Sequence, residues 1–216
     1  MLIEKDNLII RNAIAADAPL LGSWWRDGMV MAHAGFPNGL SITDDEIIKD
    51  LAACADDTGR VLIIEVDSVP IGEMNYRNID GNTAEIGIKI CVATQQEKGY
   101  GSKLITMLLD ELFCNHGYLK IILDTNLENK RAQRVYENLA FGKVGIKYNS
   151  WKNQLGVLQS AVDYEMSRDD YFSHKAGMTD KTGWEPENRK YFDDIVDVHD
   201  KRRSECHLLP MEVCGL

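Results

Sequence analysis

The sequence is short of positive charge, with 24 lysine and arginine residues against 34 aspartate and glutamate residues and a formal net charge of −10. Proteins that bind DNA or RNA without sequence preference need clustered lysine and arginine, so we expect no nucleic-acid partner. The chain also lacks an apolar run of the roughly 18 residues that a membrane-spanning helix requires. Its N-terminus has no signal-peptide pattern. These absences predict a cytoplasmic protein without a membrane partner.

Cysteine is scarce and irregularly spaced. The five cysteines form no CxxC pair and their number is odd, which is typical of a reducing compartment rather than of a disulfide framework. The five histidines show no metal-ligand spacing with them. We therefore predict that the protein uses no metal.

The length of 216 residues and the hydrophobic content of 44% are enough for one full core. After Ser167 the chain becomes highly charged, with only scattered apolar residues. We predict one domain over residues 1–167. Residues 168–216 form a charged C-terminal extension, either helical or partly disordered, that packs on the body or on a partner.

Period-two alternation predicts strands and apolar residues at helical spacing predict helices. The first strands form an antiparallel meander, whereas the strand after the helix 103–113 returns parallel to the strand before it. The class is therefore α+β (α/β), with a mixed, mostly antiparallel sheet of about seven strands, one central parallel pair and about four helices. The predicted strands are 8–12, 61–66, 71–78, 83–92, 118–125, 141–148 and 160–166, and the predicted helices are 17–25, 43–55, 103–113 and 130–139.

The stretch from Gln96 to Ser102 places two glycines between a predicted strand and a predicted helix. A helix N-terminus presents free backbone N–H groups and the positive end of the helix dipole, which together bind phosphate. Gly99 and Gly101 allow the main chain to approach a ligand closely. The dinucleotide pattern GxGxxG and the P-loop pattern GxxxxGK[ST] are both absent, which leaves Q-x-x-G-x-G.

Two segments together resemble the GNAT superfamily of N-acetyltransferases. Gln96, Gly99 and Gly101 match the family's pyrophosphate loop, Q/R-x-x-G-x-G/A. The family's later N…A…YE…GF segment is matched by Asn129, Ala132, Tyr136, Glu137 and Phe141. Ala140 departs from this pattern, because the family usually has a glycine in that turn.

The resemblance covers roughly residues 8–167 and implies the GNAT fold. The opening helix with Trp24 and Trp25 and the following segment 29–40 look most similar to the branch of ribosomal-protein N-terminal acetyltransferases and aminoglycoside acetyltransferases. The implied partners are acetyl-CoA, as the acetyl donor, and an amine acceptor. The resemblance is compatible with both a monomer and a homodimer.

The resemblance also implies how the donor is held. Backbone N–H groups along the loop would bind the pyrophosphate, with lysine side chains adding charge. The strand that carries Ile88 to Val92 would splay from its parallel neighbour and pair with the pantetheine arm. Asn129 would bond the pantetheine amide, cap its helix, or both. The residues predicted to bind the donor are Ile90, Val92, Gln96, Glu97, Lys98, Gly99, Tyr100, Gly101, Ser102 and Asn129.

By resemblance, Tyr136 is the general acid that protonates the departing CoA thiolate, a task that suits a phenol because it keeps its proton at neutral pH. The amine must lose a proton before it attacks the thioester, either to a side chain or through water. Glu73 and Asp124 are the first candidates for this catalytic base, and Glu85 is the third. For each carboxylate, an ordinary solvent-facing position on a strand is an equal interpretation. A covalent route through Cys91 is disfavoured, because no histidine lies near it in the sequence.

Aromatic residues supply candidate walls for the acceptor pocket, with core packing as the competing interpretation. They are Trp24, Trp25, Phe36, Tyr76 and Trp151. We predict an N-acetyltransferase that transfers the acetyl group directly to a primary amine, on a small molecule or at a peptide N-terminus. The alternative is a non-catalytic acyl-CoA-binding module that regulates or recruits other proteins.

Overall fold

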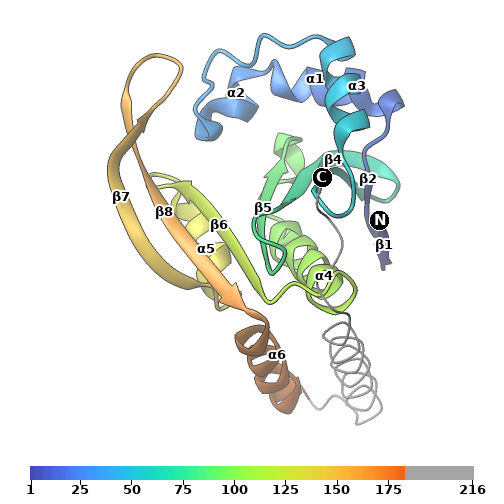
Figure 1. Cartoon of the computed structure of the whole chain (residues 1–216), viewed down its shortest axis with the longest axis vertical. Helices are drawn as coiled ribbons and strands as arrows, with labels where there is room; N and C mark the ends of the chain where they lie inside the picture. The colour runs from blue at the N-terminus through green and yellow to red at the C-terminus, as the bar shows by residue number, and fades with distance from the viewer. Residues whose placement is uncertain (183–216) are drawn as a thin grey trace, which may run out of the picture.

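The computed structural model describes residues 1–182, which form one eight-stranded sheet with helices on both faces (Figure 1). The strand order is β1-β2-β3-β4-β5-β6-β8-β7, and every neighbouring pair is antiparallel except β5 and β6. The predicted mixed sheet with a central parallel pair is therefore confirmed. The strands are β1 (Leu2–Lys5), β2 (Leu8–Asn12), β3 (Gly59–Val66), β4 (Val69–Asn78), β5 (Thr83–Ile90), β6 (Lys120–Asn126), β7 (Gly142–Lys152) and β8 (Leu158–Ser167).

The strand that the sequence did not indicate is β1. It pairs with β2 through a tight turn at Asp6, which has a positive φ of 53°. Only four residues long and mostly exposed, β1 carries too few alternating apolar residues to stand out as a strand. The sheet therefore has eight strands rather than about seven.

The four predicted helices are all present, with two additions. The short α2 lies in a segment that has no clear period in the sequence, and α6 lies in the predicted extension. The helices are α1 (Ala18–Trp25), α2 (Gly28–Met31), α3 (Asp44–Ala53), α4 (Tyr100–Cys114), α5 (Lys130–Asn138) and α6 (Arg168–Thr182).

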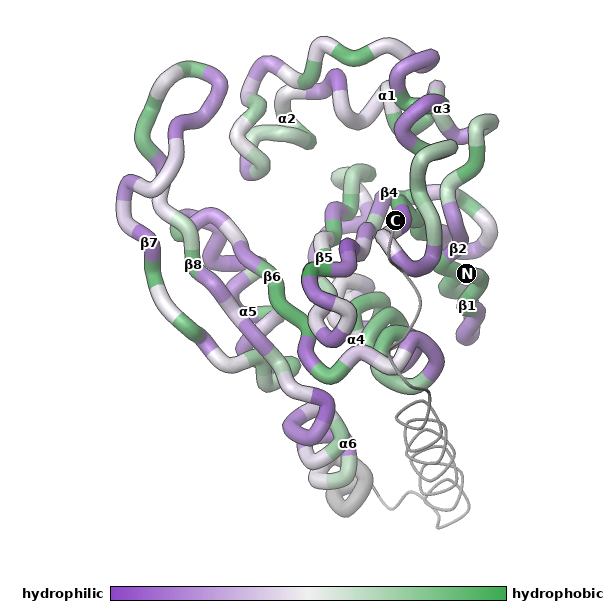
Figure 2. Tube along the Cα trace, in the orientation of Figure 1, coloured by the Kyte–Doolittle hydropathy of each residue, from purple (hydrophilic) through white to green (hydrophobic). Residues whose placement is uncertain are grey.

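The core is divided between the two faces of the sheet. Leu104, Leu108 and Leu112 of α4 are fully buried against one face, in the larger cluster. On the other face, α1 and α3 pack around Ile63 in a smaller cluster. In Figure 2 the hydrophobic residues gather in α4 and the strands beside it, whereas β7 and β8 change repeatedly between hydrophilic and hydrophobic residues. Because α1 and α3 cover only the first strands, the polar face of β4, β5 and β6 stays open.

The folded body continues beyond Ser167. Tyr171 of α6 is buried in the larger core cluster, and its hydroxyl donates a hydrogen bond to the Asp110 carboxylate on α4 at 2.9 Å. The first turns of the segment predicted as an extension are thus anchored to the body. Residues 183–216 lie outside the described part of the chain.

The parallel pair β5 and β6 holds together over a short distance only. Its register joins Thr83, Ala84 and Glu85 to Lys120, Ile121 and Ile122, and no later residues of the two strands are paired with each other. The second half of β5 pairs with β4 alone, and the second half of β6 pairs with β8 alone. The two strands therefore diverge, as the resemblance implied, and leave a gap in the middle of the sheet (Figure 1).

Candidate active site

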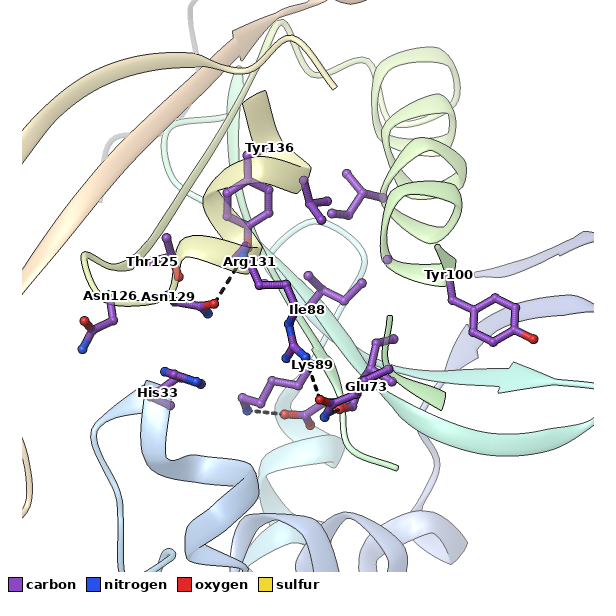
Figure 3. Close-up of a pocket in the computed structure, with 18 of the residues that line it drawn as sticks. His33, Glu73, Ile88, Lys89, Tyr100, Thr125, Asn126, Asn129, Arg131 and Tyr136 are labelled. Carbon is purple, nitrogen blue, oxygen red and sulfur yellow. Dashed lines mark hydrogen bonds and ion pairs between the residues drawn. The ribbon is translucent and has the colours of Figure 1, made fainter. Parts of the chain in front are cut away.

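A cavity of about 870 Å³ runs through the gap between β5 and β6. One end is lined by the loop before α4 and by the first turns of α4 and α5, and the other end by β4, α2 and Trp151 of β7. Figure 3 shows Tyr136 on one side, Glu73 and Lys89 on the floor and His33 on the facing side. The cavity therefore has two ends that are lined by different elements, and the gap between β5 and β6 connects them.

At the first end, the N-terminus of α4 is open. Gly99 occupies the N-cap position in the left-handed conformation, with φ of 78°, and Glu97 also has a positive φ, of 62°. Within the described chain, no side chain caps this helix and no acidic residue lies in its first turn. A Cβ added at Gly99 or Gly101 would meet no described atom within 4 Å. The free N–H groups and the space above both glycines form a cradle that fits a phosphate.

Gln96 links this loop to two neighbouring elements. Its Nε2 donates to the Ile90 carbonyl oxygen at 2.8 Å, and its Oε1 accepts from Arg131 Nη1 at 2.7 Å. The side chain therefore fixes the loop to the end of β5 and to the first turn of α5. This shows what a glutamine at the start of the motif does structurally.

The first turns of α5 add positive charge to the same end. Arg131 and Arg134 line the cavity, and Asn129 caps the helix, with its Oδ1 accepting from the Ala132 amide at 3.2 Å. Cations at a helix N-terminus oppose the helix dipole, and an anion bound there would offset this unfavourable interaction. Neither arginine was among the residues predicted to bind the donor. The run of basic residues after Asn129 was the sequence feature that could have indicated them.

Tyr136 comes from the middle of α5 and is 6% exposed. Its side chain points into the cavity (Figure 3), and its ring packs edge-on against Phe141 and Tyr164. Burial raises the pKa of the phenol to about 12, and the nearby Asp124 carboxylate contributes in the same direction. The hydroxyl therefore stays protonated throughout the neutral range.

Asp124 lies on β6, just beyond the last residues that pair with β5. Its side chain reaches solvent within the cavity, yet desolvation by the surrounding walls raises the pKa of the carboxyl. The carboxylates of Glu85 and Asp163 raise the pKa further, while Lys147 opposes them. Asp124 is thus an accessible carboxylate whose affinity for a proton is increased.

Glu73, unlike Asp124, is buried and ion-paired. It is 3% exposed, and both of its carboxylate oxygens are occupied, one by the Lys89 ammonium and the other by Trp25 Nε1 at 2.7 Å. Register explains the pairing with Lys89, because the two residues lie directly opposite each other on β4 and β5. Glu73 borders the cavity as one half of an ion pair and not as a free carboxylate.

Seven sequence candidates do not line the cavity, namely Val92, Lys98, Glu85, Trp24, Trp25, Phe36 and Tyr76. Glu85 is instead paired with Arg77 on β4. Val92 uses its N–H in a bond to the Ile71 carbonyl oxygen, and Lys98 points to Gln95 on the surface. Trp24 and Tyr76 are buried core residues, which corrects their assignment as acceptor walls, and Phe36 lies on the surface at 37% exposure. A single sequence does not distinguish an aromatic residue in a core from one in a pocket wall, because both environments are apolar.

At the second end, the structure brings in residues that the sequence analysis did not assign. His33 and Ala34 line the cavity from the turn after α2, together with Met29 and Val30. Trp151 is the one predicted acceptor-wall residue that borders the cavity directly, while Trp25 reaches it only through its bond to Glu73. Segment 29–40 has no period in the sequence, so nothing there indicated which side chains face inward.

Two further findings concern the described residues alone. Across residues 1–182, no group of three or more His, Cys, Asp or Glu side chains is arranged to hold a metal ion. In the same range, the helices are too short or too polar to span a membrane.

The comparisons with known proteins now give the class. The family model described as an acetyltransferase (GNAT) domain matches residues 7–142. The chain therefore belongs to the GNAT family of acetyltransferases, and it is an enzyme of that class. A search of curated proteins by sequence found no match.

Solved structures with the same fold include two amine acetyltransferases. Spermidine N-acetyltransferase from Vibrio cholerae, solved with CoA and spermine, has a TM-score of 0.68 at 21% identity, with 78% of this chain and 99% of that chain covered. RimL, a ribosomal alpha-N-protein acetyltransferase solved with coenzyme A, has a TM-score of 0.69 at 14% identity, with 79% and 99% covered. A putative acetyltransferase from Salmonella typhimurium with acetyl-CoA has a TM-score of 0.62 at 21% identity, with 75% and 94% covered. At these identities the likeness concerns the fold.

Proposed function

We propose that this protein transfers the acetyl group of acetyl-CoA directly to a primary amine, with Asp124 as the catalytic base and the Tyr136 hydroxyl as the hydrogen-bond donor to the leaving sulfur. The observation that carries this proposal is the single cavity through the gap between β5 and β6. It has an open, positively charged helix N-terminus at one end, and Asp124 and Tyr136 in its wall. Solved proteins of this fold hold CoA or acetyl-CoA, which supports the same donor here.

The residues at the first end fit such a donor. The backbone N–H groups before and within the first turn of α4 would receive the pyrophosphate, and Arg131 would add a charge-assisted bond. The edge of β5 around Ile88, which has no strand partner on the side of β6, offers main-chain groups to an amide-containing arm, as an exposed strand edge does. The N-terminus of α4 thus suits the pyrophosphate of acetyl-CoA, and the adjacent edge of β5 suits its amide-containing arm.

Asp124 is a better base than Glu73. Both carboxylate oxygens of Glu73 are already bonded, whereas Asp124 is accessible and its pKa is raised by desolvation and by two nearby carboxylates. The acidic group around Asp124 would also attract a protonated amine. The role of Glu73 is then to hold Lys89 and Trp25 in place on the floor of the cavity.

Tyr136 acts on the leaving group. A thiol has a pKa of roughly 8.5, below the value of about 12 that burial gives this phenol. Full proton transfer to a free thiolate would therefore be uphill, so the main effect of the hydroxyl is a hydrogen bond to the charge that develops on the sulfur. Cys91 offers no competing covalent route, because burial raises the pKa of its thiol to about 12.

The test is amine-dependent release of free thiol from acetyl-CoA, measured with a library of primary amines. We expect Asp124→Asn to lower kcat by about 10²–10⁴-fold and Tyr136→Phe by a similar order, while acetyl-CoA binding is retained. Tyr164→Phe is the matched control, since that phenol packs beside Tyr136 but bonds Glu137. Wild-type rates in Asp124→Asn would contradict the assignment of the base.

The pH dependence of kcat/KM gives a second test. Asp124 must be deprotonated to accept a proton, so activity should fall as pH falls through its raised pKa. Asp163→Asn removes one carboxylate that raises this pKa, and it should move the acidic limb to lower pH without abolishing activity. Tyr136 must stay protonated, so the basic limb of the pH profile should lie near pH 12, above the pH range in which enzymes are ordinarily assayed.

No observation favours the non-catalytic alternative. An acyl-CoA-binding module would need the donor end of the cavity, but it would not need a carboxylate and a phenol at the far side of the sheet gap. Binding of acetyl-CoA without release of thiol in the presence of any library amine would support this alternative.

A further inference from the structure

Gln154, in the turn between β7 and β8, makes three hydrogen bonds to the loop between α2 and α3. Its backbone N–H donates to the Gly35 carbonyl oxygen at 2.8 Å. Its side-chain Nε2 donates to the Gly39 carbonyl oxygen at 3.0 Å, and its Oε1 accepts from the Asn38 amide at 2.9 Å. The two segments are more than a hundred residues apart in the sequence, and Figure 1 shows the tip of the β7–β8 hairpin beside the segment that follows α2.

The same contact places Trp151. A Cβ built on Gly35 would lie 2.4 Å from a ring carbon of Trp151, so the indole lies directly against the backbone of Gly35. Gly35 has a positive φ of 94°, which together with this contact demands glycine. Trp151, His33 and Ala34 line the second end of the cavity. The fastened segments therefore form a wall of the acceptor side.

The wall consists of the loop after α2 and the β7–β8 hairpin, and each of these segments is also attached to the rest of the protein. The loop after α2 is held at its far end, where the Leu40 amide donates to the Trp25 carbonyl oxygen at 2.7 Å. On the other side, β8 pairs with β6 along seven residues and so is fixed in the sheet. The tip of the hairpin has little apolar burial to hold it in place, because Leu155, Val157 and Leu158 are 60%, 53% and 51% exposed. The polar contacts of Gln154 thus supply the connection.

We propose that Gln154 determines the specificity for the acceptor by closing a ring of chain over that end of the cavity. This proposal rests on the proposed function and names its substrate class, primary amines on an unbranched chain. The closed wall presents Trp151, Val30 and Met29 to the methylene groups of such an amine, and Asp124 to its nitrogen. A primary amine on a bulky cage, or one at the surface of a folded protein, is excluded by the wall.

The test compares two probe amines, n-butylamine and 1-aminoadamantane, by thiol release from acetyl-CoA. We expect the wild-type protein to prefer n-butylamine in kcat/KM, and Gln154→Ala to reduce that preference by about tenfold, which is the scale of one pocket contact. The gain should come from faster turnover of the cage amine, with acetyl-CoA affinity unchanged. Lys152→Ala is the matched control, because that exposed side chain lies on the same hairpin and away from the contact. An unchanged ratio in Gln154→Ala would overturn the proposal.

Hydrogen–deuterium exchange of segment 33–40 provides a readout that does not need activity. The Asn38 amide donates to the Gln154 side chain, so Gln154→Ala should speed its exchange by about tenfold or more, and Lys152→Ala should not. Equal exchange in Gln154→Ala and wild type would also overturn the proposal. A wild-type protein that acetylates neither amine would count against the proposed function, while the exchange result would still decide whether Gln154 holds the wall.

Discussion

Helix α3 begins at a complete capping box, whereas α4 begins with nothing of the kind. The Thr43 hydroxyl accepts from the Glu46 amide, the Glu46 carboxylate accepts from the Thr43 amide at 2.8 Å, and three acidic residues occupy the first turn. At α4 the N-cap is Gly99, and in the described structure neither a capping side chain nor an acid is found there. The first helix satisfies its own N–H groups and dipole, and the second leaves both available.

The difference between the two helix N-termini predicts that one contributes to stability and the other to ligand binding. A helix end that is satisfied internally stabilises the fold, while an open one is unfavourable until an anion arrives. Changes at α4 should therefore alter donor affinity with little effect on stability, and changes at α3 should do the reverse. Three substitutions test this, from the largest expected effect to the smallest.

Gly101→Leu should weaken acetyl-CoA binding by about 100-fold, because the side chain fills the cradle and removes about two charge-assisted bonds to phosphate. The fold should not suffer, since leucine is favoured over glycine within a helix by up to ~0.8 kcal/mol. Isothermal titration and thermal unfolding measure the two quantities. Equal loss of affinity and of stability would show that the glycine serves the helix instead.

Arg131→Ala should weaken acetyl-CoA binding by about tenfold, the worth of one charge-assisted bond. The remaining affinity should depend less on salt, because one exposed cation near the phosphates is gone. Titrations at two ionic strengths measure both effects. Arg60→Ala is the matched control, since its guanidinium is paired with Asp56 away from the donor end. The same loss in Arg60→Ala would indicate a general effect of net charge.

Thr43→Ala should lower the free energy of unfolding by about 1 kcal/mol, the usual cost of losing an N-cap, and leave donor affinity unchanged. Denaturant unfolding followed by circular dichroism measures the first quantity. A variant with wild-type stability would show that the capping box at α3 is not a stabilising feature, and the contrast between the two helices would disappear.

Local sequence signals indicated most of the fold and the donor end of the site. The helix predicted over 43–55 is present because its apolar spacing is local, and the two glycines at 99 and 101 could be interpreted because they lie between a strand and a helix. By contrast, β1 was missed because four exposed residues carry little pattern. Asp17, the first residue of the predicted helix 17–25, makes no side-chain cap bond to that helix, because its carboxylate is bound by Arg11 and the Ile14 amide.

The acceptor end was the part that could not be predicted residue by residue. Glu73 and Asp124 were equal candidates in the sequence, yet Glu73 is ion-paired with Lys89 across a strand pair, whereas the pKa of Asp124 is raised by desolvation and by carboxylates on two other strands. Trp24 and Trp25 are adjacent in the sequence, but one packs in a core and the other bonds Glu73. Such distinctions depend on the partners of each side chain, which are far away in the chain.

By itself, the sequence determined the family, the mixed sheet and the loop that begins α4, because each depends on residues close together in the chain and on their spacing. Only the tertiary structure decided which carboxylate is free of an ion pair, which aromatic residues face the cavity, and that Gln154 bonds the loop after α2. These properties arise from contacts between distant segments, where register, burial and neighbouring charge set the state of each group.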